Sequence, residues 1–290
     1  MNKDEVAIIG GAGFIGSRLT ARLKKSNFLS RKYDIDQSNQ LDKSTYLDVE
    51  DIKSLDQLAG VNTIINLAAV HRDDVYPTSR YDDVNVQGAK NICEAARKFD
   101  IPQIIFTSSV AIYGFAPANT DESGESNYFN DYGRTKYLAE QVYKAWQLED
   151  PKIRSLVIVR PTVVFGEGNR GNVYNLLRQI ASRRFLMFGH GRNKKSMAYV
   201  ENVAAFIEYS LSFKKGVHIY NYIDKPDFDM NSLISTVRKI LFGKHNVGLR
   251  LPSYAGIVLG YMADFVAMVI RKPLPISSIR MKKFMGTTQF

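Results

Sequence analysis

The sequence predicts an α/β fold, in which a doubly wound parallel sheet is followed by a smaller C-terminal lobe. Three observations predict it. Apolar runs typical of buried parallel strands alternate with helical periodicity over residues 1–110, a glycine-rich turn joins the first run to the first helix, and a later run ends in hydroxyl side chains. Since ligands of such sheets bind beyond the carboxyl ends of the strands, we expect the functional site at that edge.

Length and composition are those of a globular protein with a large core. The chain has 290 residues, and we assign residues 1–166, with 197–225 returning, to a dinucleotide-binding domain. Residues 167–196 and 226–290 are assigned to a substrate-binding lobe. The single cysteine, Cys93, cannot form an internal disulfide, and the N-terminus runs directly into the first strand with no room for a signal peptide. Both features predict a cytoplasmic protein.

The glycine-rich turn spans residues 8–16 (IIGGAGFIG) and lies between an apolar strand and a helix with apolar residues at every fourth position. Gly10 lets the chain reverse tightly, and Gly13 lets the backbone approach a pyrophosphate. Gly16 lets the helix pack close to the sheet. The turn therefore predicts a dinucleotide whose pyrophosphate lies at a helix N-terminus.

A second apolar segment follows at residues 33–36 (YDID), and its last residue bears on the choice of cofactor. Asp36 lies twenty residues beyond Gly16, where an acid can bind the ribose hydroxyls of an adenine dinucleotide. NAD rather than NADP is expected, because Asp36 would repel a 2'-phosphate and is followed by Gln37 instead of arginine. The alternative is an ordinary surface turn with Asp36 as a solvated loop acid.

Later segments continue the sheet. Residues 46–49 form a short segment that could place Asp48 and Val49 beside the adenine. Residues 63–69 form a continuous apolar run, and the small residues at its end allow a cofactor to approach closely. Residues 84–99 carry a helical apolar stripe, and residues 104–109 form another buried strand.

A second motif consists of Tyr132 and Lys136. Tyrosine and lysine four residues apart on a helix point the same way, so the ammonium can lie near the phenol oxygen. A nearby cation favours the phenolate, which makes the tyrosine a usable proton acceptor. Ser109, at the end of a strand, can complete the site by holding a substrate hydroxyl. The alternative is a solvated helix face.

Together these residues resemble the extended short-chain dehydrogenase/reductase superfamily, the Rossmann-type sugar epimerases and dehydratases. The resemblance covers nearly the whole chain and includes Asn85 and residues 160–166 (RPTVVFG). It implies that Asp36 holds the adenosine ribose, that Asp48 and Val49 flank the adenine, and that Lys136 holds the nicotinamide ribose. Ser109 and Tyr132 would transfer protons, with Asn85 supporting the strand that carries them. The implied cofactor contacts are Gly10, Gly13, Phe14, Ile15, Gly16, Asp36, Asp48, Val49, Leu67, Ala68, Ala69, Asn85, Ser108, Tyr132, Lys136 and Pro161, and no metal is expected.

Four further segments, residues 69–75, 169–177, 195–200 and 220–226, resemble bacterial epimerases that act on undecaprenyl-diphosphate-linked N-acetylglucosamine. This resemblance implies an NAD-dependent 4-epimerase that forms lipid-linked N-acetylgalactosamine through a 4-keto intermediate, in O-antigen or lipopolysaccharide synthesis. Two alternatives remain open. One is a 4-epimerase or 4-keto reductase for UDP- or dTDP-linked sugars, and the other is a dinucleotide sensor without catalysis.

Substrate contacts are expected from two groups of residues. His71, Arg72, Asp73 and Asp74 follow a strand and should rim the cleft, with His71 on the sugar and Arg72 on the diphosphate; a surface cluster of compensating charges is the alternative. Arg170, Asn172, Arg192 and Lys195 are further diphosphate candidates. Arginine suits bidentate phosphate contact, whereas Lys195 supplies only a point charge.

The basic C-terminus predicts an acidic partner. Of the net charge of +10, +6 lies in the last 47 residues. No base-reading module is present, so we expect an anionic inner-membrane surface rather than nucleic acid. Residues 254–270 carry one charge, Asp264, and fall short of a membrane span; they form either an interfacial helix or a core helix of the lobe. Gly256 and Gly260 predict a close helix contact, and a homodimer is left open.

Overall fold

The structure is a computed structural model that describes residues 5–38, 43–72, 75–270, 272, 274 and 277–290. The chain divides into two compact units. The first comprises residues 1–116, 121–168 and 198–223, and the second residues 117–120, 169–197 and 224–290. These divisions lie within two residues of the boundaries expected from the sequence, except that residues 117–120 join the second unit.

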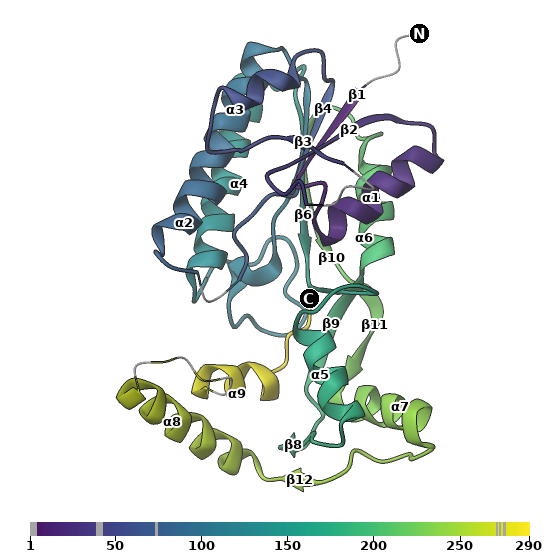
Figure 1. Ribbon diagram of the computed structural model, residues 1–290, viewed down its shortest axis with the longest axis vertical. Coiled ribbons are helices and arrows are strands. Elements are labelled where there is room, and N and C mark those ends of the chain that lie inside the picture. The colour runs from purple at the N-terminus through teal and green to yellow at the C-terminus, as the bar shows by residue number, and fades with distance from the viewer. Residues whose placement is uncertain (1–4, 39–42, 73–74, 271, 273, 275–276) are drawn as a thin grey trace. The chain divides into compact units, whose positions relative to one another are not determined.

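The first unit contains a seven-stranded sheet in the order β10-β6-β5-β4-β1-β2-β3 (Figure 1). All of its neighbouring strands pair in parallel, which confirms the predicted doubly wound sheet. The strand order reverses between β1 and β4, and a ligand of such a sheet binds at this point. The strands are β1 Glu5–Ile9, β2 Leu29–Asp34, β3 Thr45–Tyr46, β4 Thr63–Asn66, β5 Gln103–Thr107, β6 Ser155–Pro161 and β10 Gly216–Tyr222.

Helices cover both faces of this sheet (Figure 1). The helices α1 (Phe14–Lys25) and α6 (Val200–Ser210) lie on one face, and α3 (Gly88–Lys98) and α4 (Asp131–Glu149) lie on the other. Each face has its own buried apolar cluster. Shorter elements connect them: η1 Ser54–Leu58, α2 Ser79–Tyr81, η2 Asp82–Gln87, η3 Val110–Tyr113 and β7 Val163–Phe165.

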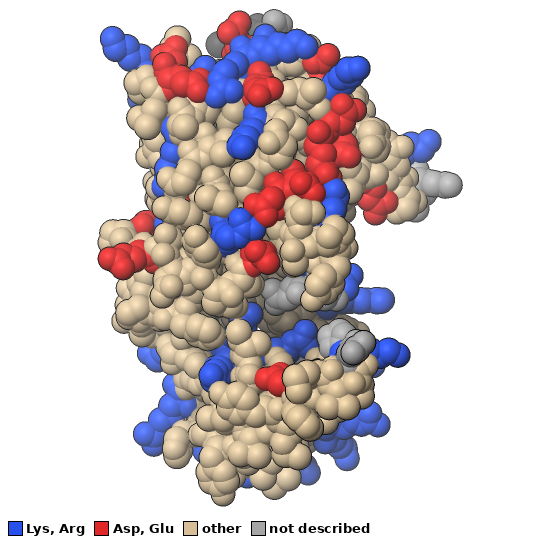
Figure 2. Space-filling view, turned by 90° about the vertical axis from the view of Figure 1, so that its left-hand side faces the viewer, with Lys and Arg blue, Asp and Glu red and all other residues tan. Residues whose placement is uncertain are grey.

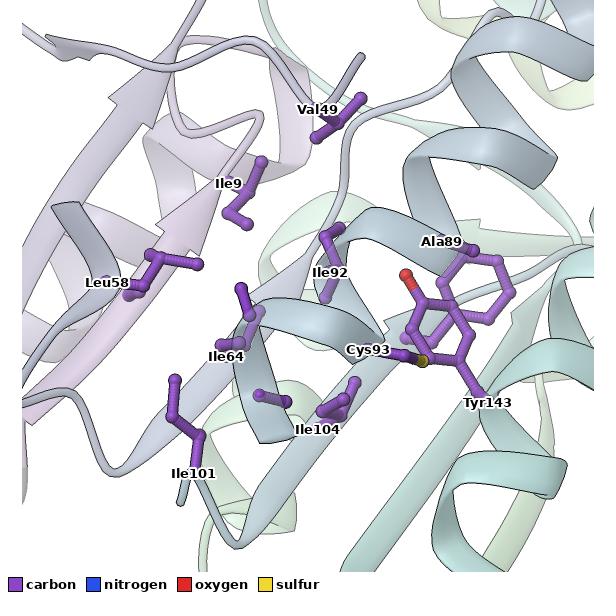
Figure 3. Packing of buried hydrophobic residues seen from close by; sticks show 14 of the residues in the cluster. Ile9, Val49, Leu58, Ile64, Ala89, Ile92, Cys93, Ile101, Ile104 and Tyr143 are labelled. Carbon is purple, nitrogen blue, oxygen red and sulfur yellow. The ribbon is translucent and has the colours of Figure 1, made fainter. Parts of the chain in front are cut away.

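The larger apolar cluster packs the sheet against α3 and α4 (Figure 3). Ile9, Ile64 and Ile104 come from three adjacent strands, and Cys93 and Tyr143 reach them from the two helices. Burial raises the pKa of the Cys93 thiol to about 12, so this cysteine is an inert core residue.

Three segments differ in detail from the sequence analysis. The apolar segment at residues 33–36 is a strand only as far as Asp34, which pairs with Tyr46 of β3, and Ile35 is 63% exposed. Of the short segment at residues 46–49, only Tyr46 belongs to a strand, β3. The helical stripe at residues 84–99 is confirmed, but its helix starts as the π-helical segment η2 and becomes α-helical only at Gly88.

The second unit is smaller and mixed. Strand β11 (Asp224–Asp229) pairs antiparallel with β9 (Lys194–Tyr199), and β12 (Arg250–Leu251) pairs parallel with β8 (Met187–Phe188). A small core of Ile180, Phe185, Met187, Met230 and Ile234 holds it together. Its helices are α5 Asn172–Ala181, α7 Met230–Phe242, α8 Ser253–Ile270 and α9 Ser278–Met285.

Candidate active site

The glycine turn packs so tightly that two of its glycines accept no side chain. Gly10 has φ +78°, and a Cβ atom on it would lie 2.7 Å from the backbone nitrogen of Ala68, in the loop after β4. A Cβ atom on Gly16 would lie 2.3 Å from the carbonyl oxygen of Gly10. Helix α1 therefore starts directly against the turn. Its N-cap is Gly13, which brings no side chain to the helix N-terminus, and this suits an anion there.

The acid that contacts this turn is Asp34, which the spacing in the sequence did not single out. Its Oδ2 accepts a hydrogen bond of 2.9 Å from the backbone nitrogen of Ala12. Asp36, the predicted ribose acid, lies in the exposed loop beyond β2, where its Oδ1 accepts a 2.8 Å bond from the Ser38 nitrogen. Hydrogen bonds from Ser38 lower the pKa of Asp36. The signal for Asp34 was an acid at the end of the apolar strand, two residues before Asp36.

The predicted adenine contacts differ in character. The side chain of Val49 is 5% exposed and belongs to the core, where a Cβ atom on Gly88 would lie 2.7 Å from it. Its carbonyl accepts a 2.8 Å hydrogen bond from Asn91. Asp48 lies at the start of a turn and accepts a 2.9 Å bond from the Glu50 nitrogen. Packing therefore accounts for Val49, and its adenine contact stays a prediction.

Asn85 fixes the loop after β4 to helix α4. Its side chain donates to the carbonyl of Val70 at 3.0 Å and accepts from the nitrogen of the same residue at 2.9 Å. It also donates to Thr135 Oγ1 on α4 at 2.9 Å. We expected it to support a strand; it instead supports the helix that carries Tyr132 and Lys136.

The two serines after β5 have separate roles. Ser108 is 1% exposed, and its hydroxyl donates to Glu140 Oε1 at 2.6 Å, so its side chain is committed to the protein interior. Ser109 is half-buried and caps η3, with its Oγ accepting a 3.1 Å bond from the Ala111 nitrogen. Of the two, only Ser109 is open to a substrate hydroxyl.

Helix α4 brings the tyrosine and the lysine to this edge of the sheet. A Cβ atom on Gly133 would lie 2.5 Å from the carbonyl oxygen of Ala111, so the first turn of α4, with Tyr132, packs directly on the segment that Ser109 caps. Lys136 is buried, and its ammonium donates to the carbonyl of Thr107 at 2.8 Å. Ser109 and Lys136 thus lie at the carboxyl end of β5, and the backbone turn that carries Tyr132 packs beside them. Burial lowers the pKa of Lys136 to about 7, against the opposing effect of Glu140.

Below these residues lies a buried ion pair that sequence reasoning missed. Arg160 on β6 donates to the Glu140 carboxylate through Nε at 2.9 Å and Nη2 at 2.7 Å. Both side chains are at most 5% exposed. The pair links β6 to α4, and Ser108 joins β5 to it. The available signal was the position of Glu140, one helical turn beyond Lys136 and therefore on the same face of α4.

The predicted rim after β4 is described only in part. His71 is exposed, and its Nδ1 lies 3.4 Å from the carbonyl of Ala69. The carbonyl of Arg72 accepts a hydrogen bond from the Tyr81 hydroxyl. Asp73 and Asp74 lie outside the described residues. The substrate roles of His71 and Arg72 stay predictions.

In the second unit, two of the diphosphate candidates flank a helix N-terminus and a third lines a pocket. Arg170 and Asn172 are exposed at the start of α5. Arg192 lines an open pocket of about 570 Å³ together with His190 and Ser253. The loop that carries Arg192 is held by Asn231 on α7, which donates to the His190 carbonyl at 3.0 Å.

Lys195 is engaged elsewhere. Its ammonium donates to the carbonyls of Lys283 at 2.7 Å and Gly286 at 2.6 Å, at the end of α9. Burial lowers its pKa to about 8. These bonds hold the C-terminal segment, so a diphosphate would compete with two backbone carbonyls for this cation.

Comparison with known proteins gives a family. Residues 6–222 match the NAD dependent epimerase/dehydratase family. The N-acetyl-alpha-D-glucosaminyl-diphospho-ditrans,octacis-undecaprenol 4-epimerase of Escherichia coli O157:H7 is 48% identical over 290 residues, which cover 99% of this chain and 87% of that protein.

Solved structures agree in fold. The UDP-glucose 4-epimerase of Thermus thermophilus, in complex with NAD, aligns with a TM-score of 0.70 at 19% identity over 86% of each chain. The UDP-glucuronic acid 4-epimerase of Bacillus cereus, also with NAD, aligns with a TM-score of 0.71 at 21% identity over 86% of this chain and 87% of the other. At such identities the likeness concerns the fold alone.

Proposed function

Because this chain belongs to the NAD-dependent epimerase/dehydratase family, we propose that it is a sugar 4-epimerase whose substrate is N-acetylglucosamine linked through a diphosphate to undecaprenol. The observation that carries the proposal is 48% identity, over 99% of the chain, to an Escherichia coli enzyme with that name. The reaction would interconvert lipid-linked N-acetylglucosamine and N-acetylgalactosamine. Its product would serve the synthesis of surface polysaccharide such as O-antigen.

The first unit has the features that NAD requires. The turn has no room for side chains at Gly10 and Gly16, and helix α1 begins at a glycine N-cap that suits a pyrophosphate. We assign the ribose contact to Asp34, at the end of β2, with Asp36 as the alternative based on spacing. When bound there, NAD would supply reversible hydride transfer at carbon 4 of the sugar.

The residues of the chain handle the proton and the orientation of the sugar. Tyr132 takes the proton from the 4-hydroxyl and returns it after the sugar has turned over. Lys136, one helical turn away, favours the phenolate form of that tyrosine by its charge. Ser109 holds the reacting hydroxyl, since its Oγ lies at the edge of the sheet beside the first turn of α4.

We further propose that Arg170, Asn172 and Arg192 bind the diphosphate, and that His71 and Arg72 contact the substrate at the rim. Arginine forks match phosphate oxygens, and Arg192 lines a pocket in the second unit. Lys195 is left out, because its ammonium already holds two carbonyls. A lipid-linked substrate stays in the bilayer, so we place the enzyme at the cytoplasmic face of the inner membrane as a peripheral protein.

The mechanism is tested by replacing the proposed base. Tyr132→Phe should lower the turnover of lipid-linked N-acetylglucosamine by about 10²–10⁴-fold, because the phenol oxygen is lost. The control is Tyr137→Phe, a half-buried tyrosine in the same helix whose ring packs on Tyr128. Turnover by the wild type should leave the ratio of NAD to NADH unchanged. Stoichiometric oxidation of NADH would instead identify a 4-keto reductase, and full activity of Tyr132→Phe would contradict the assignment of the base.

A further inference from the structure

Helix α8 presents an unusually apolar surface. It has 18 residues, of which only Gly256 and Gly260 are buried. Eleven large apolar side chains on it are at least 36% exposed, including Phe265 at 63% and Met268 at 67%. A core helix would bury such a stripe, so the core-helix interpretation of this segment is wrong. By length and composition alone, α8 could cross a membrane.

The single charge of α8 is turned away from this apolar surface. Asp264 Oδ2 accepts a 3.1 Å hydrogen bond from the nitrogen of Ser278, at the start of α9, where a carboxylate also interacts well with the helix dipole. A Cβ atom on Gly260 would lie 2.7 Å from Ser278 Cα, and one on Gly256 would lie 2.9 Å from Met281. The close helix contact predicted for the two glycines is therefore confirmed, and α8 and α9 form a hairpin (Figure 1).

Both ends of this hairpin return to the same unit. Before α8, Arg250 pairs with Met187 of β8. After α9, Thr288 donates to the Lys194 carbonyl at 3.0 Å and accepts from the Ser196 nitrogen at 2.8 Å. A bilayer core of about 30 Å would have to be crossed twice, and the eight residues of α9 reach only about 12 Å. Helix α8 therefore cannot span a membrane while these contacts hold.

Basic side chains accompany the apolar surface. Helix α9 carries Arg280, Lys282 and Lys283, and Lys272 follows α8. Lys282 lies 5.7 Å from the ring of Tyr261 on α8, so the basic and apolar parts adjoin. In Figure 2, Lys and Arg surround the lower part of the molecule, where little acidic surface is visible. Arg271, also counted as part of the basic tail, lies outside the described residues.

We propose that the α8–α9 hairpin docks the protein on an anionic bilayer, with α8 lying within one leaflet and the basic side chains of α9 on the phosphate headgroups. An apolar face of this width beside cations fits the boundary between acyl chains and anionic headgroups. The inference rests on the proposed function in one respect, since a lipid-linked substrate requires a membrane surface. It adds which residues provide that contact and excludes α8 as a transmembrane helix while the contacts at both ends of the hairpin hold.

Flotation with lipid vesicles tests the apolar contact. Wild-type protein should float with phosphatidylglycerol-containing vesicles and far less with pure phosphatidylcholine. Phe265→Glu should abolish flotation. The matched control is Leu148→Glu in the first unit, since Leu148 is 69% exposed and the charge change is identical. Loss of flotation in both variants, or in neither, would overturn the proposal.

The basic contribution is tested separately. Arg280→Gln and Lys283→Gln should each weaken partitioning to the anionic vesicles about fivefold, since a basic residue near the surface contributes about that factor. Raised salt should have the same effect on the wild type. Unchanged partitioning in both variants would remove the headgroup contact from the proposal.

Depth is measured with a tryptophan probe. The only tryptophan, Trp146, is fully buried, so brominated acyl chains should not quench it. Fluorescence of Phe265→Trp should be quenched by bromine placed within one leaflet of the vesicle. Absence of quenching, with wild-type flotation intact, would place the contact elsewhere on the protein.

Two further outcomes separate this inference from the proposed function. The first outcome is that the wild type never floats, and that ultracentrifugation at high concentration finds a dimer for the wild type but a monomer for Phe265→Glu. A second copy of the chain then covers α8, and the inference fails. Turnover of lipid-linked sugar could still be normal in that case. Conversely, flotation without any turnover of lipid-linked sugar would refute the proposed function and leave the docking surface intact.

Discussion

Lys136 is a cation in a place where a cation is costly. It is buried at the end of β5, bonded to one carbonyl, and its pKa is lowered to about 7 by burial. A lysine whose pKa is lower in the folded than in the unfolded protein destabilises the fold most at pH values below its folded-state pKa, where it is charged in both states. That cost is relieved as the pH rises from about 7 toward the unfolded value near 10.5. Burying this lysine therefore does not stabilise the fold at neutral pH, which is the pattern expected of a residue at a functional site.

Because the buried charge of Lys136 destabilises the fold, a neutral side chain at this position should stabilise it in a pH-dependent way. In nucleotide-free protein, Lys136→Met should raise the melting temperature relative to the wild type below pH 7, because Met buries no charge. The difference should shrink between pH 7 and pH 10 as the wild-type lysine becomes neutral in the folded state. Differential scanning fluorimetry across this range measures it. A difference that grows with pH would show that the lysine is not buried as described.

The aspartate that ends β2, Asp34, and the one in the following loop, Asp36, give a second prediction at the scale of residues. Asp34 contacts the glycine turn, whereas Asp36 is exposed and its carboxylate accepts a hydrogen bond from the nearby Ser38 nitrogen. Asp34→Asn should weaken NAD binding about tenfold or more, as expected for loss of hydrogen bonds to a charged group, and Asp36→Asn should weaken it less. Titration calorimetry on both variants decides the order. The reverse order would restore Asp36 as the ribose contact.

At the scale of elements, the turn before α1 depends on close approach as well as on backbone conformation. Gly10 and Gly60 have similar φ angles, +78° and +84°, but only a Cβ on Gly10 meets backbone, since nothing lies within 4 Å of the one on Gly60. Gly60→Ala should therefore cost about 1 kcal/mol of stability and leave NAD binding intact. Gly10→Ala should lose NAD binding as well. Equal nucleotide affinity in the two variants would contradict the described packing.

Helix α4 offers a comparison of two carboxylates along its length. Glu140 is buried in its pair with Arg160, while Glu149 is 41% exposed beside Arg97. Glu140→Gln should lower the free energy of unfolding by about 3–5 kcal/mol, because it leaves Arg160 buried without its counter-ion. Glu149→Gln should change it by less than about 1 kcal/mol. Urea unfolding of both variants measures the difference, and similar losses would argue against the buried pair.

At the scale of the whole molecule, the fold followed from patterns that are local in sequence. Apolar runs and the glycine turn predicted the parallel sheet, and they do so because buried parallel strands are apolar on both faces. The proposed pair of Tyr132 and Lys136 was identified by helical spacing, and Ser109 by its place at the end of a strand.

Contacts between segments that are distant in the sequence could not be predicted. The Glu140–Arg160 pair joins residues that are 20 positions apart, and Lys195 is engaged by carbonyls about 90 residues away. Asp34 was missed because the end of β2 is set by its pairing with Tyr46 of β3, which spacing alone does not reveal.

The central claim is that this site inverts carbon 4 of a sugar while the sugar stays on its lipid carrier. The most direct measurement incubates the protein with undecaprenyl-diphosphate N-acetylglucosamine and, in a separate reaction, with UDP-N-acetylglucosamine, and then hydrolyses each product and identifies the sugar. We predict N-acetylgalactosamine from the lipid-linked substrate and little from the nucleotide-linked one. N-acetylgalactosamine from the UDP-linked sugar alone would contradict the account.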